Sequence, residues 1–488
     1  MRLIVVERPE RWPFHIPGVE VVAAREYLTA ERWGEASRVS VLNFCRSYAK
    51  NTTGYYVGLL ALARGHRPLP SVTTLQSLQV DSVVRVVSDD LQERIQSSLR
   101  PLKSDRFELS VYFGRNLAKR YAQLSRDLFQ HFPIPFLRAR FERDGDGVWS
   151  LIGIRPVPAS DVPDDHGPFV IESAERFFKR SGLGGPPKRE MRYDMAILWS
   201  EDDPQAPSDA AAIRKFVRAA ERVGIKAETI DPEDFALLEF YDALFIRETT
   251  HIGHHTHRFA LRAEAAGIVV IDDPESIVRC TNKVYQTELF RRRRIPMPKT
   301  MVVHAGNRHA VAAEVGLPCV LKDPAGSFSV GTVKAETEDG LREALDDLFR
   351  QSELVIAQEW TPTAFDWRVG VLDGGPLYAS RYHMARGHWQ IIQSEGEGPP
   401  RYGRVEAVPL DAVPGPVMEV AVRAAGLIGH GLYGVDLKEL DDGRVVVTEV
   451  NDNPNIDAGC EDGVLGDALY DAIMRHFLSA LDARGRTP

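Results

Sequence analysis

The chain has 488 residues, of which 44% are hydrophobic and 26% are charged, and its formal net charge is −9. A chain of this length is expected to form about two to four globular domains, and the negative charge argues against general binding to nucleic acids or anionic membranes. Four scattered cysteines without a CxxC pair indicate a reducing compartment. Because no apolar run approaches ~20 residues and the opening stretch is too short for a secretory signal, we expect a cytoplasmic protein.

Residues 1–185 alternate apolar, β-favouring runs with helix-like segments, which predicts an N-terminal α/β domain. The expected elements are strands at 3–6, 19–23, 39–44 and 109–113, helices at 53–65 and about 116–132, and a hairpin over 136–154. No constellation of nucleophile and base stands out, so the sequence assigns no task to this domain. The Gly- and Pro-rich stretch 181–187 predicts a linker.

Residues 190–275 predict a second, smaller α/β domain. The expected elements are strands at 194–199, 225–230, 243–246 and 268–271, and helices at about 208–224 and 256–266. Ser208 is the expected N-cap of the first of these helices. The domain lacks a glycine-rich dinucleotide fingerprint, which disfavours NAD binding.

This second domain also contains a run of four histidines, at His251, His254, His255 and His257. No nearby set of cysteines or carboxylates completes a tetrahedral zinc site. A loop that contacts substrate and a plain surface or helix-start position are the alternatives to zinc. Arg247 and His255 are the candidate substrate-binding residues.

The stretch 434–455 has two β-favouring runs on either side of Asp442-Gly443, a preferred two-residue hairpin turn. With that turn, Asp436 lies opposite Glu449, and Asn451 points to the same face because strand side chains alternate. Two facing carboxylates repel unless a hard cation lies between them, and Mg²⁺ commonly binds such oxygen ligands together with phosphates. The alternative is a solvated hairpin, or a longer turn that shifts the register.

The preceding hairpin, 366–383, is expected to turn at Gly374-Gly375. That register places Arg368 opposite Arg381, and two facing guanidinium groups indicate an anion between them. An acid pair and a base pair on successive hairpins would suit a metal ion and a polyphosphate. Two independent surface hairpins with incidental charges are the alternative.

Further candidate nucleotide-binding residues precede these hairpins. Lys283 is expected near the start of a helix, and Lys322 at the end of a strand. The loop that follows, 323–331, includes Gly326 and Ser327 and is flexible enough to place amides and hydroxyls on phosphates. A plain hairpin turn would give the same pattern, and the loop is not a P-loop.

Taken in order, these residues resemble the ATP-grasp superfamily, and most of all its RimK-like branch. The resemblance rests on Lys283, Val-Leu-Lys322 with its Gly/Ser loop, Gln358-Glu359-Trp360, Asp366-x-Arg368, Gly-Val-Asp436 and Glu449-Val-Asn451. It covers about residues 191–475, and the N-terminal third resembles an extra domain that some RimK-like proteins carry. The implied fold is α/β, with α+β character in the C-terminal part. The implied domains are an N-terminal domain at 1–185, a pre-ATP-grasp domain at 190–275, and an ATP-grasp domain at 276–488 with lobes of about 276–358 and 359–488.

The resemblance also implies roles for individual residues. ATP would be bound by Lys283 and Lys322 at the α- and β-phosphates, Gly326 and Ser327 in the loop, Glu359 and Trp360 at the adenine with Gln358 beside them, and Asp366 near the ribose. Two Mg²⁺ ions, or Mn²⁺, would be held by Asp436, Glu449 and Asn451. Arg368 and Arg381 would act in catalysis at the γ-phosphate and the acyl-phosphate. Related proteins often have Arg-Ser-Asn where this chain has Trp389-Gln390-Ile391-Ile392.

The implied activity is an ATP-dependent carboxylate–amine ligase that forms an amide through an acyl-phosphate. Its carboxylate would come from glutamate or another amino acid, and its acceptor would be a peptide, a protein or a small amine. A homo-oligomer is compatible with the resemblance. No protein nucleophile is required, because positioning and electrostatics supply most of the catalysis of phosphoryl transfer. Two alternatives stay open: an ATP-dependent kinase on the same fold, and a non-catalytic nucleotide-sensing protein.

Overall fold

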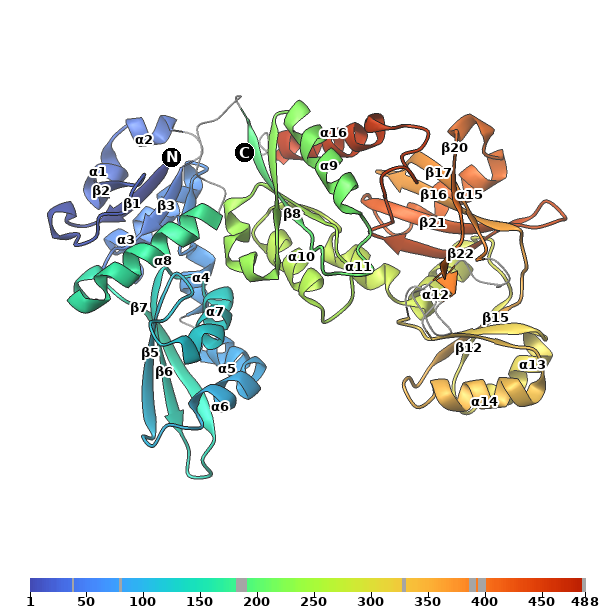
Figure 1. Cartoon of the computed structure of the whole chain (residues 1–488), viewed down its shortest axis with the longest axis horizontal. Helices are drawn as coiled ribbons and strands as arrows, with labels where there is room; N and C mark the ends of the chain where they lie inside the picture. Colours follow the sequence, from blue (N-terminus) through green and yellow to red (C-terminus); the bar gives the residue numbers. More distant parts are fainter. Residues whose placement is uncertain are drawn as a thin grey trace. The chain divides into compact units, whose positions relative to one another are not determined.

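The computed structural model describes residues 1–36, 39–78, 81–180, 191–326, 331–385, 392–393 and 401–484. The chain divides into two units (Figure 1), Met1–Lys188 with Glu233–Phe240 and Arg189–Pro232 with Tyr241–Pro488. The expected linker at 181–187 lies outside the described residues. Within the described ranges, no helix combines the length and the apolar character that crossing a bilayer requires.

The first unit contains two sheets with helices packed on them. Its elements are β1 (Arg2–Val6), β2 (Glu20–Ala23), α1 (Ala24–Thr29), α2 (Arg32–Glu35), β3 (Ser40–Asn43), α3 (Thr53–Ala63), β4 (Arg67–Leu69), α4 (Val72–Ser77), α5 (Asp81–Asp90), α6 (Gln92–Leu99), β5 (Arg106–Tyr112), α7 (Ala122–His131), β6 (Phe136–Arg143), β7 (Trp149–Pro156) and α8 (Gly167–Arg180). Strands β2, β1, β3 and β4 form a parallel sheet in that order, and β1 and β3 are buried along nearly their whole length, as expected of strands covered on both faces. Strands β5, β6 and β7 form an antiparallel sheet that contacts α5 to α8.

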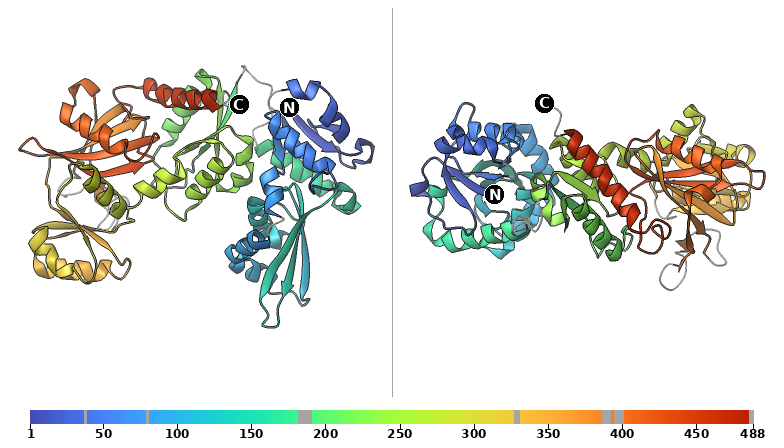
Figure 2. Two further views of the ribbon diagram at one scale, coloured as in Figure 1. Left: turned by 180° about the vertical axis from the view of Figure 1, so that it is seen from behind. Right: turned by 90° about the horizontal axis from the view of Figure 1, so that it is seen from above.

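The second unit begins with a parallel sheet of order β11-β10-β8-β9. Its elements are β8 (Tyr193–Leu198), α9 (Ala210–Arg222), β9 (Ile225–Ile230), β10 (Ala243–Ile246), α10 (His255–Ala265) and β11 (Val269–Ile271), joined by α16 (Asp467–Arg484) from the C-terminal end. Helix α16 lies alongside α9 (Figures 1 and 2), and Phe216 of α9 packs edge-on against Tyr470 of α16. The last helix of the chain therefore completes the layer formed by residues 191–271.

The N-cap of α9 is Asp209, not the expected Ser208. The Asp209 side chain accepts a hydrogen bond of 2.7 Å from the backbone N–H of Ala212. The Ser208 hydroxyl donates instead to the carbonyl oxygen of Ile456, at 2.9 Å. Serine and aspartate cap helices about equally well, so the distant contact with Ile456 decides between them.

Two larger antiparallel sheets and the two-stranded sheet β18-β19 lie in the described part of the rest of the second unit. Their elements are α11 (Pro274–Cys280), α12 (Lys283–Arg293), β12 (Thr300–Val303), α13 (Val311–Glu314), β13 (Cys319–Lys322), β14 (Thr332–Ala335), α14 (Glu338–Leu348), β15 (Val355–Glu359), β16 (Phe365–Leu372), β17 (Gly375–His383), β18 (Ile392–Gln393), β19 (Arg401–Tyr402), β20 (Val405–Val408), α15 (Gly415–Ala425), β21 (Leu432–Glu439) and β22 (Val445–Asp452). The first sheet has the order β12-β15-β13-β14, and the second β20-β17-β16-β21-β22. Helices α13 and α14 pack on the first sheet, and α15 packs on the second. The expected α/β fold with α+β character toward the C-terminus is confirmed.

The five-stranded sheet has one packed face and one polar face. Trp367 and Val369 of β16 are at most 1% exposed and belong to the core that includes α15. Asp366 and Arg368 alternate with them and therefore point to the other face. This polar face carries the candidate active site.

Candidate active site

The hairpin of β21 and β22 brings Asp436 opposite Glu449, as the sequence predicts. Its turn, however, is not the expected two-residue turn at Asp442-Gly443. Leu440 N donates to Arg444 O at 2.8 Å, which leaves a three-residue loop, and a register shift next to Asp436 compensates for it. The two deviations cancel, so Asp436 and Glu449 form the expected pair. The role of this pair in metal binding stays a prediction.

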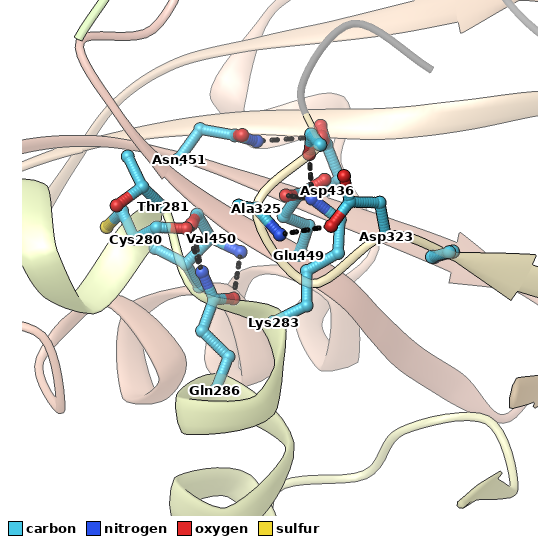
Figure 3. Close-up of polar contacts among 12 residues, drawn as sticks. Cys280, Thr281, Lys283, Gln286, Asp323, Ala325, Asp436, Glu449, Val450 and Asn451 are labelled. Carbon is cyan, nitrogen blue, oxygen red and sulfur yellow. Dashed lines mark hydrogen bonds and ion pairs between the residues drawn. The ribbon is translucent and has the colours of Figure 1, made fainter. Parts of the chain in front are cut away.

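Asp436 has two side-chain partners on the polar face. Arg368 donates from Nε to Oδ1 and from Nη2 to Oδ2, the latter at 2.8 Å. Asn451 donates from Nδ2 to Oδ2 at 2.9 Å (Figure 3). Burial raises the pKa of Asp436 above its ordinary value, and the Arg368 guanidinium opposes that rise. Asp436, Arg368 and Asn451 therefore form one hydrogen-bonded group.

Glu449 faces two lysines. Lys283 Nζ lies 2.8 Å from Glu449 Oε1 (Figure 3). Burial alone would raise the pKa of Glu449, but the charges of Lys283 and Lys322 outweigh burial, so the pKa is lowered. Glu449 is therefore ionised at neutral pH and attracts cations.

Gln286, which no sequence motif indicates, fixes α12 against β22. Its Nε2 donates to Val450 O at 2.7 Å, and its Oε1 accepts from Val450 N at 2.9 Å (Figure 3). Gln286 lies one helical turn after Lys283, so this pair of hydrogen bonds sets where Lys283 meets Glu449. The i, i+3 spacing from Lys283 was the available signal.

The hairpin of β16 and β17 contradicts the expected arginine pair. Its turn is Asp373-Gly374, one residue earlier than expected, and both residues have the positive φ (48° and 73°) that a type I′ turn requires. After a register shift at Gly370, Arg368 lies opposite Ser380. The prediction that Arg368 faces Arg381 is therefore wrong, because a slip of one residue sends a side chain to the other face.

Arg381 lies opposite Trp367, on the face that packs against α15. Its guanidinium carbon is 4.9 Å from the ring centroids of both Phe365 and Trp367, within the range of cation–π contacts. Its buried Nε has no hydrogen-bond partner among the described residues. Arg368, not Arg381, is thus the arginine that the fold brings to Asp436.

Lys322, at the end of β13, belongs to a buried polar chain. Its Nζ donates to Gln358 Oε1 at 2.9 Å, and Gln358 Nε2 donates to Thr300 Oγ1 at 3.0 Å. Burial lowers the pKa of Lys322 to about 8, with Glu449 opposing and Lys283 adding to the decrease. Lys322 can therefore gain or lose its proton near pH 8.

The loop after Lys322 begins against the start of α12. Lys283 donates from its backbone N–H to Pro324 O at 2.9 Å and from Nζ to Gly326 O. Gly326 thus lies beside Lys283, as a shared phosphate site would need. Ser327 falls outside the described residues, as do Trp389, Gln390 and Ile391 of the segment that departs from related proteins.

The expected adenine-binding residues lie at the end of β15. Glu359 N donates to Lys299 O at 2.9 Å, and Lys334 Nζ lies 4.5 Å from the ring centroid of Trp360. A cavity of about 20 Å³ lies where α12, β13, β15 and β22 meet, lined by Lys283, Gln286, Thr287, Phe290, Met297, Lys322, Ile356, Gln358, Val447 and Thr448. This volume holds about one water molecule, so a purine would have to bind outside it or displace its walls.

Asp366, the expected ribose contact, is paired with Lys438. Lys438 Nζ donates to Asp366 Oδ1 at 2.5 Å, and Thr363 Oγ1 donates to the same oxygen at 2.7 Å. Lys438 lies two residues after Asp436 on β21, so strand alternation was the signal that could have found it. It adds a further cation to the polar face.

Arg247, an expected substrate contact, has no exposed surface. Its guanidinium donates to Ser208 Oγ (3.0 and 2.8 Å), Asn453 Oδ1 (2.7 Å), Pro207 O (2.6 Å) and Pro454 O (2.8 Å). These bonds join the end of β10 to the chain that follows β22. The role of Arg247 in substrate binding stays a prediction.

His255, the other expected substrate contact, is partly accessible. Its Nε2 lies in close contact with Glu248 Oε2, and 21% of its side chain is exposed, against 3% for Glu248. The ring of the neighbouring His254 contacts it, with the centroids 3.9 Å apart and the ring planes tilted by 46°. Its role in substrate binding stays a prediction.

The polar face is better suited to Mg²⁺ that is shared with a substrate than to a metal ion held by protein side chains alone. In the part of the chain that the structure describes, no three histidine, cysteine or carboxylate side chains are grouped to hold a metal by themselves. Asp436, Glu449 and Asn451 offer two carboxylates and an amide oxygen, and Mg²⁺ usually takes one or two carboxylates and completes its shell with water and substrate phosphates. The residues therefore fit Mg²⁺ bound together with a polyphosphate.

Two family models match the chain. One, described as the RimK-like ATPgrasp N-terminal domain, matches residues 24–173, and the other, described as the D-ala D-ala ligase C-terminus, matches residues 289–458. The first match lies within the N-terminal unit. The second spans α12 to β22 and includes Arg368, Asp436 and Glu449.

Curated relatives match about half of this chain over most of their own length. The alpha-aminoadipate–LysW ligase LysX of Saccharolobus solfataricus is 25% identical over 49% of this chain and 88% of its own. A D-alanine–D-alanine ligase of Alkalilimnicola ehrlichii is 25% identical over 54% and 85%. A probable alpha-L-glutamate ligase of Pseudoalteromonas atlantica is 27% identical over 44% and 70%.

Solved structures also match this chain. The D-alanine–D-alanine ligase of Bacillus anthracis superposes with a TM-score of 0.48 at 14% identity, over 60% of this chain and 99% of that one. The ATP-grasp ligase PsnB, complexed with a minimal precursor, gives 0.44 at 22% identity, over 59% and 98%.

Proposed function

Because this chain belongs to the ATP-grasp ligases and carries a RimK-like N-terminal domain, we propose that it joins an amino-acid carboxylate to an amine on the polar face of β16, β21 and β22. ATP phosphorylates the carboxylate, the amine displaces phosphate from the acyl-phosphate, and an amide, ADP and phosphate are released. The observation that carries this proposal is the convergence of Asp436, Glu449 and Asn451 with Arg368 and Lys283.

Asp436, Glu449 and Asn451 would hold two Mg²⁺ ions, with Mn²⁺ as a substitute. Asn451 already directs its Nδ2 at Asp436, which leaves its amide oxygen for a cation. Bound Mg²⁺ would neutralise phosphate charge and polarise the transferring phosphoryl group.

The basic residues would receive the phosphates. Lys283 and Lys322 approach Glu449 from α12 and β13, where they could bind the α- and β-phosphates. Arg368 would stabilise the charge that develops on the γ-phosphoryl group and the acyl-phosphate. Its planar guanidinium binds two oxygens of Asp436 and could bind two phosphoryl oxygens in the same way.

The substrate class is taken from the relatives. Their names specify alpha-aminoadipate with LysW, alpha-L-glutamate and D-alanine. For this chain we propose an amino acid as the carboxylate, with glutamate the first candidate, and a peptide, a protein or a small amine as the acceptor.

Hydroxylamine trapping tests the proposal. With ATP, Mg²⁺ and each of the common amino acids in turn, hydroxylamine should intercept the acyl-phosphate and give a hydroxamate together with ADP. A stable phosphoester with ADP but no hydroxamate would indicate a kinase. Binding of ATP without ADP release, across amino acids and peptides, would indicate a nucleotide sensor.

ATP binding is expected to take up a proton near pH 8. Lys322, whose pKa is lowered to about 8, is about half charged there, and a bound polyphosphate favours its ammonium form and so raises that pKa. Calorimetric titration with ATP in two buffers of different ionisation enthalpy should show an uptake of roughly half a proton at pH 8 and little at pH 6.5.

The matched control for this experiment is Lys322→Arg. Arginine stays charged throughout this pH range, so the variant should bind ATP without proton uptake. The same uptake in the variant and the wild type would contradict the assignment to Lys322.

A further inference from the structure

A histidine–carboxylate pair lies between β10 and α10. His255 is the first residue of α10, and its Nε2 contacts Oε2 of Glu248. The Glu248 carboxylate is buried, and its Oε1 has no hydrogen-bond partner among the described residues. The buried carboxylate of Glu248 therefore orients the imidazole of His255, which is the accessible member of the pair.

The carboxylate fixes which ring nitrogen of His255 is basic. An ionised carboxylate only accepts hydrogen bonds, so in neutral His255 the proton is on Nε2 and the lone pair is on Nδ1. Within the described ranges, no hydrogen bond occupies Nδ1. A buried carboxylate that orients an imidazole in this way is a common arrangement for proton abstraction by histidine.

The pair is hydrogen-bonded to the segment that follows the strand of the expected metal ligands. Asn453 Nδ2 donates to the carbonyl oxygen of Glu248 at 2.5 Å, and Arg247 Nη1 donates to Asn453 Oδ1 at 2.7 Å. Asn453 follows Asn451 by two residues. In addition, α10 contacts α11, and α11 contacts β22 (Figure 1). The pair also lies beyond the carboxyl end of β10, and ligands bind at that edge of parallel α/β sheets.

The amide-forming step needs a base. An amino group is largely protonated at neutral pH, and an ammonium nitrogen has no lone pair with which to attack a carbonyl carbon. We propose that His255, oriented by Glu248, removes this proton from the acceptor amine. This inference rests on the ligase function proposed above.

The amine nitrogen loses two protons in this step. One proton passes from the ammonium group to Nδ1 of His255, and the nitrogen lone pair forms the C–N bond. The C–O bond to phosphate then breaks, the departing phosphate keeps the electron pair, and it takes the second proton from nitrogen. The imidazolium returns its proton to solvent.

Other titratable groups surround His255. The ring of His254 contacts its ring, and Glu248 is hydrogen-bonded to it. The charges of His251 and Asp203 act on His254 from the flanking loops. Asp452, whose carboxylate interacts with Thr250, belongs to the same surroundings. A pH profile by itself would combine the titrations of all these groups. The test must therefore compare two nucleophiles.

Hydroxylamine and an alkylamine separate a base from a structural residue. Hydroxylamine is largely neutral at pH 7 and needs no base, whereas ethylamine is almost wholly protonated. With the amino acid that gives a hydroxamate in the wild type, His255→Gln should form hydroxamate within about threefold of the wild-type rate. Its formation of the ethylamide should fall by about 10²-fold at pH 7 and recover toward pH 9, as free amine accumulates.

Two further variants complete the test. Glu248→Gln should lower ethylamide formation by about tenfold and spare hydroxamate formation, because it loosens the imidazole without removing it. His257→Gln, two residues along the same helix, should match the wild type with both nucleophiles.

The outcomes are distinguishable. Equal losses with both nucleophiles in His255→Gln, or no loss with ethylamine, would overturn the inference. So would a wild-type enzyme that forms hydroxamate but no ethylamide at any pH, and this result would leave the ligase function standing. A wild type that forms no hydroxamate from any amino acid would instead overturn the proposed function.

Discussion

Asp436→Asn and Glu449→Gln are each expected to fold normally and to lose on the order of 10²–10³-fold in Mg²⁺-dependent turnover. Each substitution removes one negative charge from the proposed metal site and hardly changes the side-chain shape. The amide oxygen that each substitution introduces would still accept a hydrogen bond from Arg368 or Lys283, so each variant should fold, with a smaller loss in the free energy of unfolding than Arg368→Met. ADP release measured against Mg²⁺ concentration, with circular dichroism as the check on folding, tests this.

The matched control is Asp442→Asn. Asp442 lies in the turn of the same hairpin, where it pairs with Arg444 in solvent, 53% exposed. The variant should therefore retain turnover within about twofold, since surface ion pairs contribute little. Wild-type turnover in both Asp436→Asn and Glu449→Gln would contradict the metal assignment.

Arg368→Met is expected to lower both stability and activity. It leaves Asp436 buried without its main partner, at a cost of roughly 2–4 kcal/mol in the free energy of unfolding. Turnover should fall by about 10³-fold, because no other arginine is held against Asp436 in the described part of the chain. Denaturant unfolding followed by tryptophan fluorescence, together with ADP release at saturating ATP, measures the two effects.

Arg368→Lys separates the two effects. Lysine keeps the positive charge beside Asp436, so most of the stability should return. A compact ammonium cannot form two parallel hydrogen bonds, so turnover should remain about 10- to 100-fold below the wild type. Full activity in Arg368→Lys would show that charge alone suffices.

Arg381→Met tests the register of β16 and β17. Because Arg381 lies between Phe365 and Trp367 on the packed face, its loss should cost stability and leave turnover within a few-fold. A loss of turnover as large as that of Arg368→Met would favour the facing arginines that the Gly374-Gly375 turn predicts.

The two hairpins show how well the turn residues alone predict the register of the paired strands. In β21 and β22 the turn was longer than expected, yet a register shift next to Asp436 restored the pair with Glu449. In β16 and β17 the turn began one residue earlier, and the shift at Gly370 did not fully compensate, so Arg381 changed faces. The earlier turn moves the pairing of β16 and β17 by two residues and the bulge restores one of them, and a bulge has no strong sequence signal.

Two residues with the same prediction from the sequence differ in their burial in the structure. Arg247 and His255 both follow β10 and were both expected to contact substrate. The structure gives Arg247 five hydrogen bonds and no exposed surface, while His255 stays partly accessible on Glu248. The partners of Arg247 lie 39 and 206 residues away, at Ser208 and Asn453, so no local pattern could indicate its burial.

The sequence by itself determined the alternation of apolar and polar residues along the strands and the order of the charged motifs, and therefore the fold class. Those features depend on local periodicity, which each strand carries alone. The tertiary structure decided the face of Arg381, the burial of Arg247 and the packing of α16 against α9. Each of these depends on contacts between segments far apart in the chain, whose free energy no single segment encodes.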